Sequence, residues 1–103
     1  MDVSHESDVL VQVLSQVLAT GATAFEVEYK DGEERVFAFN GSVGMGIAAF
    51  GSETAEARQL RKQLWQLRRK RKKFRFDETD FFLKVEVYDS FGEIAFHGTI
   101  VRS

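Results

Sequence analysis

The residues best suited to bind a charged partner are cations gathered in one short stretch. Ten of the fourteen lysines and arginines lie between residues 58 and 75, and those eighteen positions contain no aspartate or glutamate. Within the stretch, Arg68 to Lys73 is an unbroken run of six cations. Like charges one helical turn apart, such as Arg68 and Lys72, each cost a helix roughly a few tenths of a kcal/mol unless an anion relieves them. The run therefore indicates a surface for an anionic partner, against the simpler interpretation of a solvated charged face.

A helix is expected to carry these cations. Apolar residues recur at helical spacing, Ser52 is a suitable N-cap, and the acids precede the cations as the helix dipole prefers. Trp65 lies off the apolar stripe, where it can stack on a base, anchor a protein contact or cover the edge of the core. We therefore predict a helix over residues 52–73 with a basic binding face. That face comprises Arg61, Trp65, Arg68, Arg69, Lys72 and Lys73.

The division of charge bears on the class of partner. Outside residues 58–75 the chain holds sixteen acids and four bases, and its net charge is −2. A dedicated nucleic-acid binder is often basic overall, whereas an acidic body and a basic helix attract each other between chains. We expect the basic face to bind an acidic protein surface, either a partner's or that of a second copy in a homodimer. RNA or DNA binding through the same helix is the alternative.

The sequence contains few residues in patterns typical of catalytic or metal-binding sites. His5 and His97 are the two histidines, no nucleophile motif is present, and the absence of cysteine excludes zinc–thiolate sites. The carboxylates of residues 76–80 lack the spacing of a calcium loop, so these residues are expected to form a solvated turn. The glycines of residues 41–51 lack the lysine of a phosphate-binding loop. We expect a protein that is not an enzyme, with no cofactor, no metal and no small-molecule substrate.

The remaining chain predicts one more helix and several strands. An apolar face with helical spacing runs through Leu10, Leu14 and Val17. Phe25 and Val27 alternate with acids before an Asp31–Gly32 hairpin signal. The further strands expected are residues 35–40, with Phe37 and Phe39 on the buried side, residues 81–88 and residues 94–100. Residues 44–50 form either a third strand or a close-packed turn.

These elements predict an α+β fold in one domain, residues 1–103. Two helices would cover one face of an antiparallel sheet of four to five strands, in the order α-β-β-(β)-α-β-β. The two hairpins share a short similarity, Ala38-Phe39-Asn40-Gly41-Ser42 matching Ala95-Phe96-His97-Gly98-Thr99. Residues 4–42 and 52–101 could therefore be copies of one αββ unit, although hairpins resemble one another by composition alone. No signal peptide or membrane span is evident, so a cytoplasmic location is expected.

Overall fold

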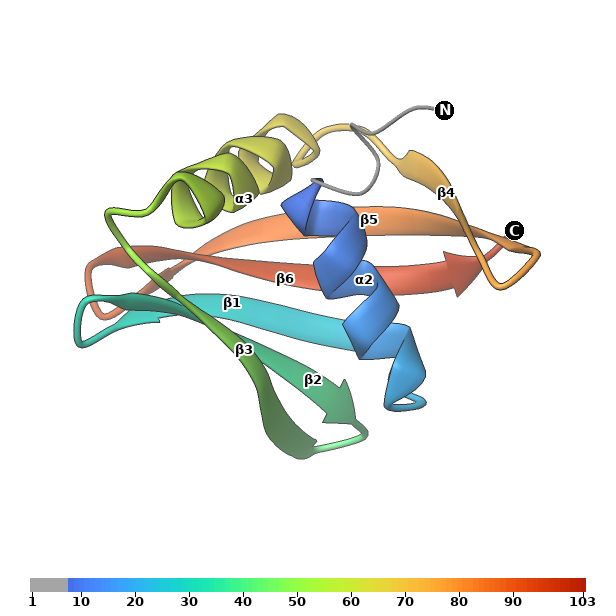
Figure 1. Ribbon diagram of the computed structural model, residues 1–103, viewed down its shortest axis with the longest axis horizontal. Helices are drawn as coiled ribbons and strands as arrows, with labels where there is room; N and C mark the ends of the chain where they lie inside the picture. Colours follow the sequence, from blue (N-terminus) through green and yellow to red (C-terminus); the bar gives the residue numbers. More distant parts are fainter. Residues whose placement is uncertain (1–7) are drawn as a thin grey trace.

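Two helices lie over one face of a six-stranded antiparallel sheet in the computed structural model, which describes residues 8–103 (Figure 1). The elements in chain order are α2 (Val9–Ala19), β1 (Ala24–Lys30), β2 (Glu33–Asn40), β3 (Val43–Gly51), α3 (Ala55–Gln66), β4 (Lys72–Phe76), β5 (Thr79–Ser90) and β6 (Glu93–Arg102). The strands are arranged in the order β3-β2-β1-β6-β5-β4. The α+β fold with two helices is confirmed, and the expected four to five strands are corrected to six.

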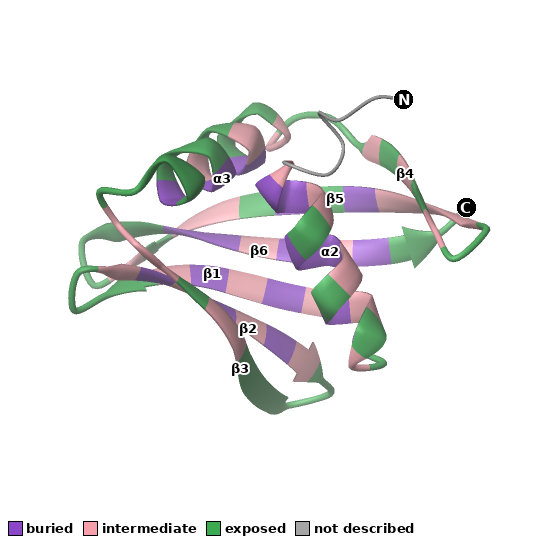
Figure 2. Cartoon of the chain, in the orientation of Figure 1, coloured by how far each residue is buried: buried purple, intermediate pink, exposed green. Residues whose placement is uncertain are grey.

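The core lies between the helices and the sheet. Helix α2 begins at Asp8, whose carboxylate accepts the backbone N–H groups of Leu10 and Val11. Its buried face and that of α3 pack on alternate residues of the central strands, which Figure 2 shows as bands of buried and less buried positions. The largest fully buried side chain is Phe25 of β1. Burial of this shared apolar surface holds the two helices on one face of the sheet.

Helix α3 is shorter than predicted at both ends. Thr54, not Ser52, is the N-cap, and its hydroxyl accepts the Ala57 N–H at 3.2 Å. The helix ends at Gln66 with Leu67 as C-cap, so the predicted helix over residues 52–73 is wrong beyond this point. After Leu67 no apolar residue continues the buried stripe, and the run of like charges opposes further helical turns.

Strand β4 occupies residues for which the sequence predicts the end of the helix, at Lys72 and Lys73, and the start of a turn, at Phe76. Phe74 and Phe76 are half-buried and alternate with the exposed Lys73 and Arg75, a period of two. The strand pairs with β5, and the rings of Phe74 and Phe81 stack with centroids 5.6 Å apart. The solvated turn expected over residues 76–80 is therefore only two residues long, Asp77 and Glu78.

Strand β2 faces the opposite way from the prediction. Val36 and Ala38 are buried on the helix side, whereas Phe37 and Phe39 lie on the other face of the sheet. Their rings cover the glycines of β3: a Cβ at Gly44 would meet the Phe39 ring at 2.7 Å. The strand interpretation of residues 44–50 is confirmed, and those glycines make room for aromatic rings.

A helix followed by three strands occurs twice in the chain. The first set spans residues 9–51 and the second residues 55–102, so each holds one strand more than the αββ unit proposed from the sequence. The two sets join where β1 pairs with β6. A common origin of the two sets stays a prediction.

Candidate functional site

The run Arg68–Lys73, called here the basic segment, is a connection and not a helix face. It leads from α3, which lies over the sheet, to β4 at the sheet edge (Figure 1). Arg68 and Arg69 lie in the turn after the helix, and Lys72 and Lys73 begin β4. The six predicted site residues therefore come from three successive pieces of backbone: helix α3, the turn after it and strand β4.

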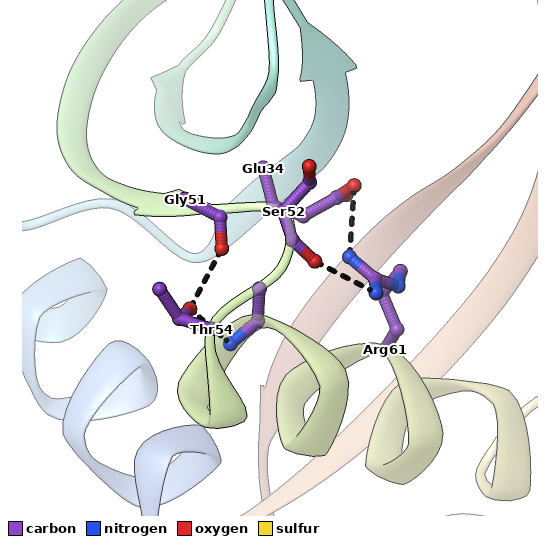
Figure 3. A network of polar contacts seen from close by, with 6 residues as sticks. Glu34, Gly51, Ser52, Thr54 and Arg61 are labelled. Atoms are coloured by element: carbon purple, nitrogen blue, oxygen red, sulfur yellow. Dashed lines mark hydrogen bonds and ion pairs between the residues drawn. The ribbon is translucent and has the colours of Figure 1, made fainter.

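Arg61 is engaged inside the protein. Its Nη1 lies 3.1 Å from Glu34 Oε2, and its Nη2 donates to the Ser52 carbonyl at 3.2 Å (Figure 3). The Glu34 side chain is 4 % exposed. Burial raises the pKa of Glu34, and the guanidinium of Arg61 opposes that rise. Arg61 thus ties α3 to β2 and is not free for a partner.

Trp65 and Arg68 form a pair of their own. The guanidinium of Arg68 lies 4.1 Å from the centre of the indole ring, and its Nη1 donates to the Trp65 carbonyl at 2.7 Å. The Arg68 side chain thus makes a cation–π contact with the indole, and its hydrogen bond satisfies a carbonyl at the end of α3. The indole is 42 % exposed, but one face of its ring is already covered.

The two lysines diverge from each other. Lys72 is half-buried on the helix side, beside Leu10 and Gln63. Lys73 is exposed and pairs with Phe82, over whose ring the Arg71 guanidinium lies at 5.8 Å. Successive strand residues point to opposite faces, so the basic segment presents charge on both sides of the sheet edge.

The cations of the basic segment have no ion-pair partner within the described chain. Among residues 8–103, no acid forms an ion pair with any cation from Arg68 to Lys73. The next cation along, Arg75, lies 3.7 Å from Asp80. Unrelieved cations in sequence repel one another, so an anionic partner would stabilise this segment.

A hollow of about 510 Å³ lies against the basic segment. One side is formed by residues 67–71 and the other by residues 84–87 of β5. Strand β4 pairs with β5 only as far as Lys72 and Leu83, so the hollow begins where that pairing stops. The sequence could not show this hollow because β4 itself was missed, although the Lys-Phe alternation of residues 73–76 was a usable signal.

A second polar cluster lies on the sheet face away from the helices. The Glu26 carboxylate accepts the Tyr88 hydroxyl at 3.2 Å and lies 3.2 Å from His97 Nδ1. Nearby, the Ser90 hydroxyl donates to Glu28 at 3.0 Å. Burial raises the pKa of Tyr88, and the two carboxylates add to the rise. The strand position predicted for His97 is confirmed, but its tie to Glu26, 71 residues away, could not be read from sequence.

Among residues 8–103, no group of three or more histidines and acids is arranged to hold a metal ion. No helix in that range has the length and apolar character needed to span a membrane. His5, the other histidine singled out by the sequence, lies outside the described residues.

Comparison with protein-family models finds no match for this chain. Comparison with curated proteins likewise finds no relative.

Proposed function

We propose that this protein is a non-enzymatic binding module whose basic segment docks an acidic surface of a protein partner. One observation carries the proposal: four cations of the basic segment, Arg68 to Arg71, line a hollow. Glu86 lines the same hollow, but no acid among residues 8–103 forms an ion pair with these four cations. Carboxylates of a partner would supply the missing counter-charge. The site is therefore the segment and its hollow, in place of a helix face.

The open face of the sheet favours a protein partner over nucleic acid. Tyr88 and His97 could offer rings to bases, but both are tied to the carboxylate of Glu26. Glu28 lies on the same face, so phosphates would meet negative charge there. The Arg68 guanidinium would have to leave the Trp65 ring before nucleic-acid bases could stack on both faces of the indole.

Charge reversal with a matched control tests the proposal. The probe is a fluorescein-labelled peptide of about ten residues made of glutamate and glycine. In Arg69→Glu with Lys70→Glu, we expect the dissociation constant to rise about tenfold or more, because two attractive charges become repulsive. In Arg58→Glu with Lys62→Glu, which changes the charge equally on exposed residues of α3, we expect less than about a twofold change. Equal losses in both variants, or no loss in either, would show that the basic segment is not the site.

Two further measurements separate the classes of partner. Sedimentation velocity over a range of protein concentrations would show larger species if the partner is a second copy, and the first variant would abolish them. Titration with labelled single-stranded RNA at two salt concentrations addresses the alternative. Tighter binding of RNA than of the peptide, weakening steeply with salt, would assign the segment to nucleic acid and overturn the proposal.

A further inference from the structure

Strand β5 is longer than the strand beside it. It pairs with β6 over ten residues, from Phe81–Arg102 to Ser90–Glu93. On its outer side it pairs with β4 only over Thr79 to Leu83. From Lys84 to Ser90, no strand among residues 8–103 lies on the outer side of β5. An edge of this kind presents unpaired backbone N–H and C=O groups at alternate residues.

The other edge of the sheet is less suited to an added strand. Strand β3 pairs with β2 on one side, and its register shifts between Val36 and Phe37. Ile47 is left without a partner by this shift, so the regular pairing of β3 is divided into two short runs. Bulges are a common device by which natural sheets prevent pairing at an edge.

The side chains around the β5 edge define what would fit there. Val85 is buried and Val87 half-buried on the helix side, where Leu67 completes an apolar wall. The basic segment lines the same hollow from Arg68 to Arg71. Lys84 and Glu86, both exposed, project from the opposite face of the strand, so the five cations of the lining stand against one acid. The hollow thus combines unpaired backbone, apolar surface and positive charge.

We propose that residues Lys84–Ser90 of β5 accept an extended acidic segment of a partner protein as an added strand. This inference rests on the function proposed above and specifies how the partner's backbone binds. Seven residues of strand span about 20 Å, enough to pair a segment of five to seven residues. The segment that fits best alternates acids with β-branched apolar residues. Its acids would then lie near the cations, and its apolar side chains would pack against Val85 and Leu67.

Outside this edge, the chain's own segment with such an alternation is not free to add. Its acids and apolar residues alternate from Phe25 to Tyr29 in β1, the strand that lies between β2 and β6. That segment pairs with β2 along its length and with β6 at Ala24 to Val27. Val85 to Asp89 has a similar alternation, but pairing this edge with the same edge of a second copy would bring two basic segments together, whose like charges repel. We therefore assign the occupant to a different protein.

Three peptides of equal length, added to the full chain, test the inference. The first alternates glutamate with valine. The second keeps every glutamate but replaces the central valines by proline, which cannot donate a backbone hydrogen bond. The third replaces glutamate by glutamine. We expect the first peptide to bind, and the second and third to bind about tenfold more weakly or worse, through lost backbone bonds and lost charge respectively.

Amide hydrogen exchange locates the bound peptide. In the complex with the first peptide, we expect slower exchange at alternate residues between Lys84 and Ser90, with no change on β3. Equal binding of the valine and proline peptides would overturn strand addition while leaving acidic docking intact. Binding of none of the peptides, the glutamate–glycine probe included, would overturn both proposals. Protection confined to β3 would assign the added strand to the other edge and refute this one.

Discussion

Arg61 Nη1 lies 3.1 Å from Glu34 Oε2, which joins the second helix to the second strand across the end of the core (Figure 3). The carboxylate is almost fully buried, and its Oε1 has no hydrogen-bond partner among residues 8–103. About two thirds of the Arg61 side chain is also covered. A carboxylate in this position depends on its one cation.

Replacing Arg61 by methionine should destabilise the protein at neutral pH by about 1–3 kcal/mol. The cost is less than that of a fully buried pair, because water reaches the guanidinium and screens it. Burial raises the pKa of Glu34 above its ordinary 4.5, and loss of Arg61 removes the effect that lowers it. As the pH falls, Glu34 of the folded variant therefore binds a proton at a higher pH than Glu34 of the unfolded chain does. The free energy of unfolding of Arg61→Met consequently rises as the pH falls toward 5. Urea unfolding at pH 7 and pH 5 should show a smaller deficit at pH 5.

The control for that experiment is Arg58→Met, which removes an exposed cation from the same helix. It should change stability by less than about 0.5 kcal/mol at either pH. A deficit of Arg61→Met that is the same at both pH values would contradict the role assigned to Glu34.

Phe91 is expected to lower the free energy of unfolding because of its backbone conformation. It is fully exposed, and its φ of 53° is left-handed, a conformation that bulky residues rarely adopt. Asp31 has the same φ in the other hairpin, where a short polar side chain is suited to it. Phe91→Asn should therefore raise the free energy of unfolding by about 1 kcal/mol, measured by urea denaturation. Asp31→Asn, the matched change, should have almost no effect, and a loss of stability in Phe91→Asn would refute the argument.

Gly98 should not tolerate a methyl group. A Cβ there would lie 2.3 Å from atoms of the buried Phe25 ring, far inside van der Waals contact. Gly98→Ala should destabilise by about 1–3 kcal/mol, since the ring has no space into which to move. Gly46→Ala is the control, because its Cβ would meet the Phe37 ring at an ordinary 3.7 Å. Thermal unfolding of both variants tests the contrast, and equal melting temperatures would disprove it.

Tyr88 should remain protonated in the folded protein well above pH 10. Burial and the neighbouring carboxylates raise its pKa, whereas the unfolded chain ionises near the ordinary value of 10.0. The stability that Tyr88 contributes is thus present below pH 10 and is lost as pH rises further. At pH 11 the folded wild type should show no more phenolate absorbance than Tyr88→Phe. The variant should be less stable at pH 7 by about 1 kcal/mol, through loss of the bond to Glu26, and this difference should shrink at pH 11.

The sequence was most informative where period and turn chemistry agreed. Phe25 and Val27 with the Asp31–Gly32 turn predicted the first hairpin, and the structure confirms it. The prediction of which face of β2 is buried is wrong because both faces of this strand carry apolar side chains. The larger rings of Phe37 and Phe39 looked like core, but the space beneath the helices takes the smaller Val36 and Ala38.

For the candidate site, the sequence predicts which residues are charged but not how they are arranged in space. The density of cations was visible, yet their arrangement depends on where α3 ends and β4 begins. Residues 68–73 contain no apolar residue, so no periodicity separates helix from connection there. The partner of Arg61 could not be foreseen either, because the predicted strand begins only at Arg35 and leaves Glu34 in the polar hairpin loop, and burial is a tertiary property.

The pairing of β1 with β6 is the one strand contact between residues 9–51 and 55–102 in the described chain. At this seam Phe25 from one half lies opposite Gly98 from the other. A chain cleaved at Glu53 would give two fragments of one helix and three strands each, and neither could bury Phe25 alone. Such fragments are suited to a complementation assay. If each is fused to one of two interacting proteins, binding of those proteins would bring the fragments together and restore the pairing of β1 with β6.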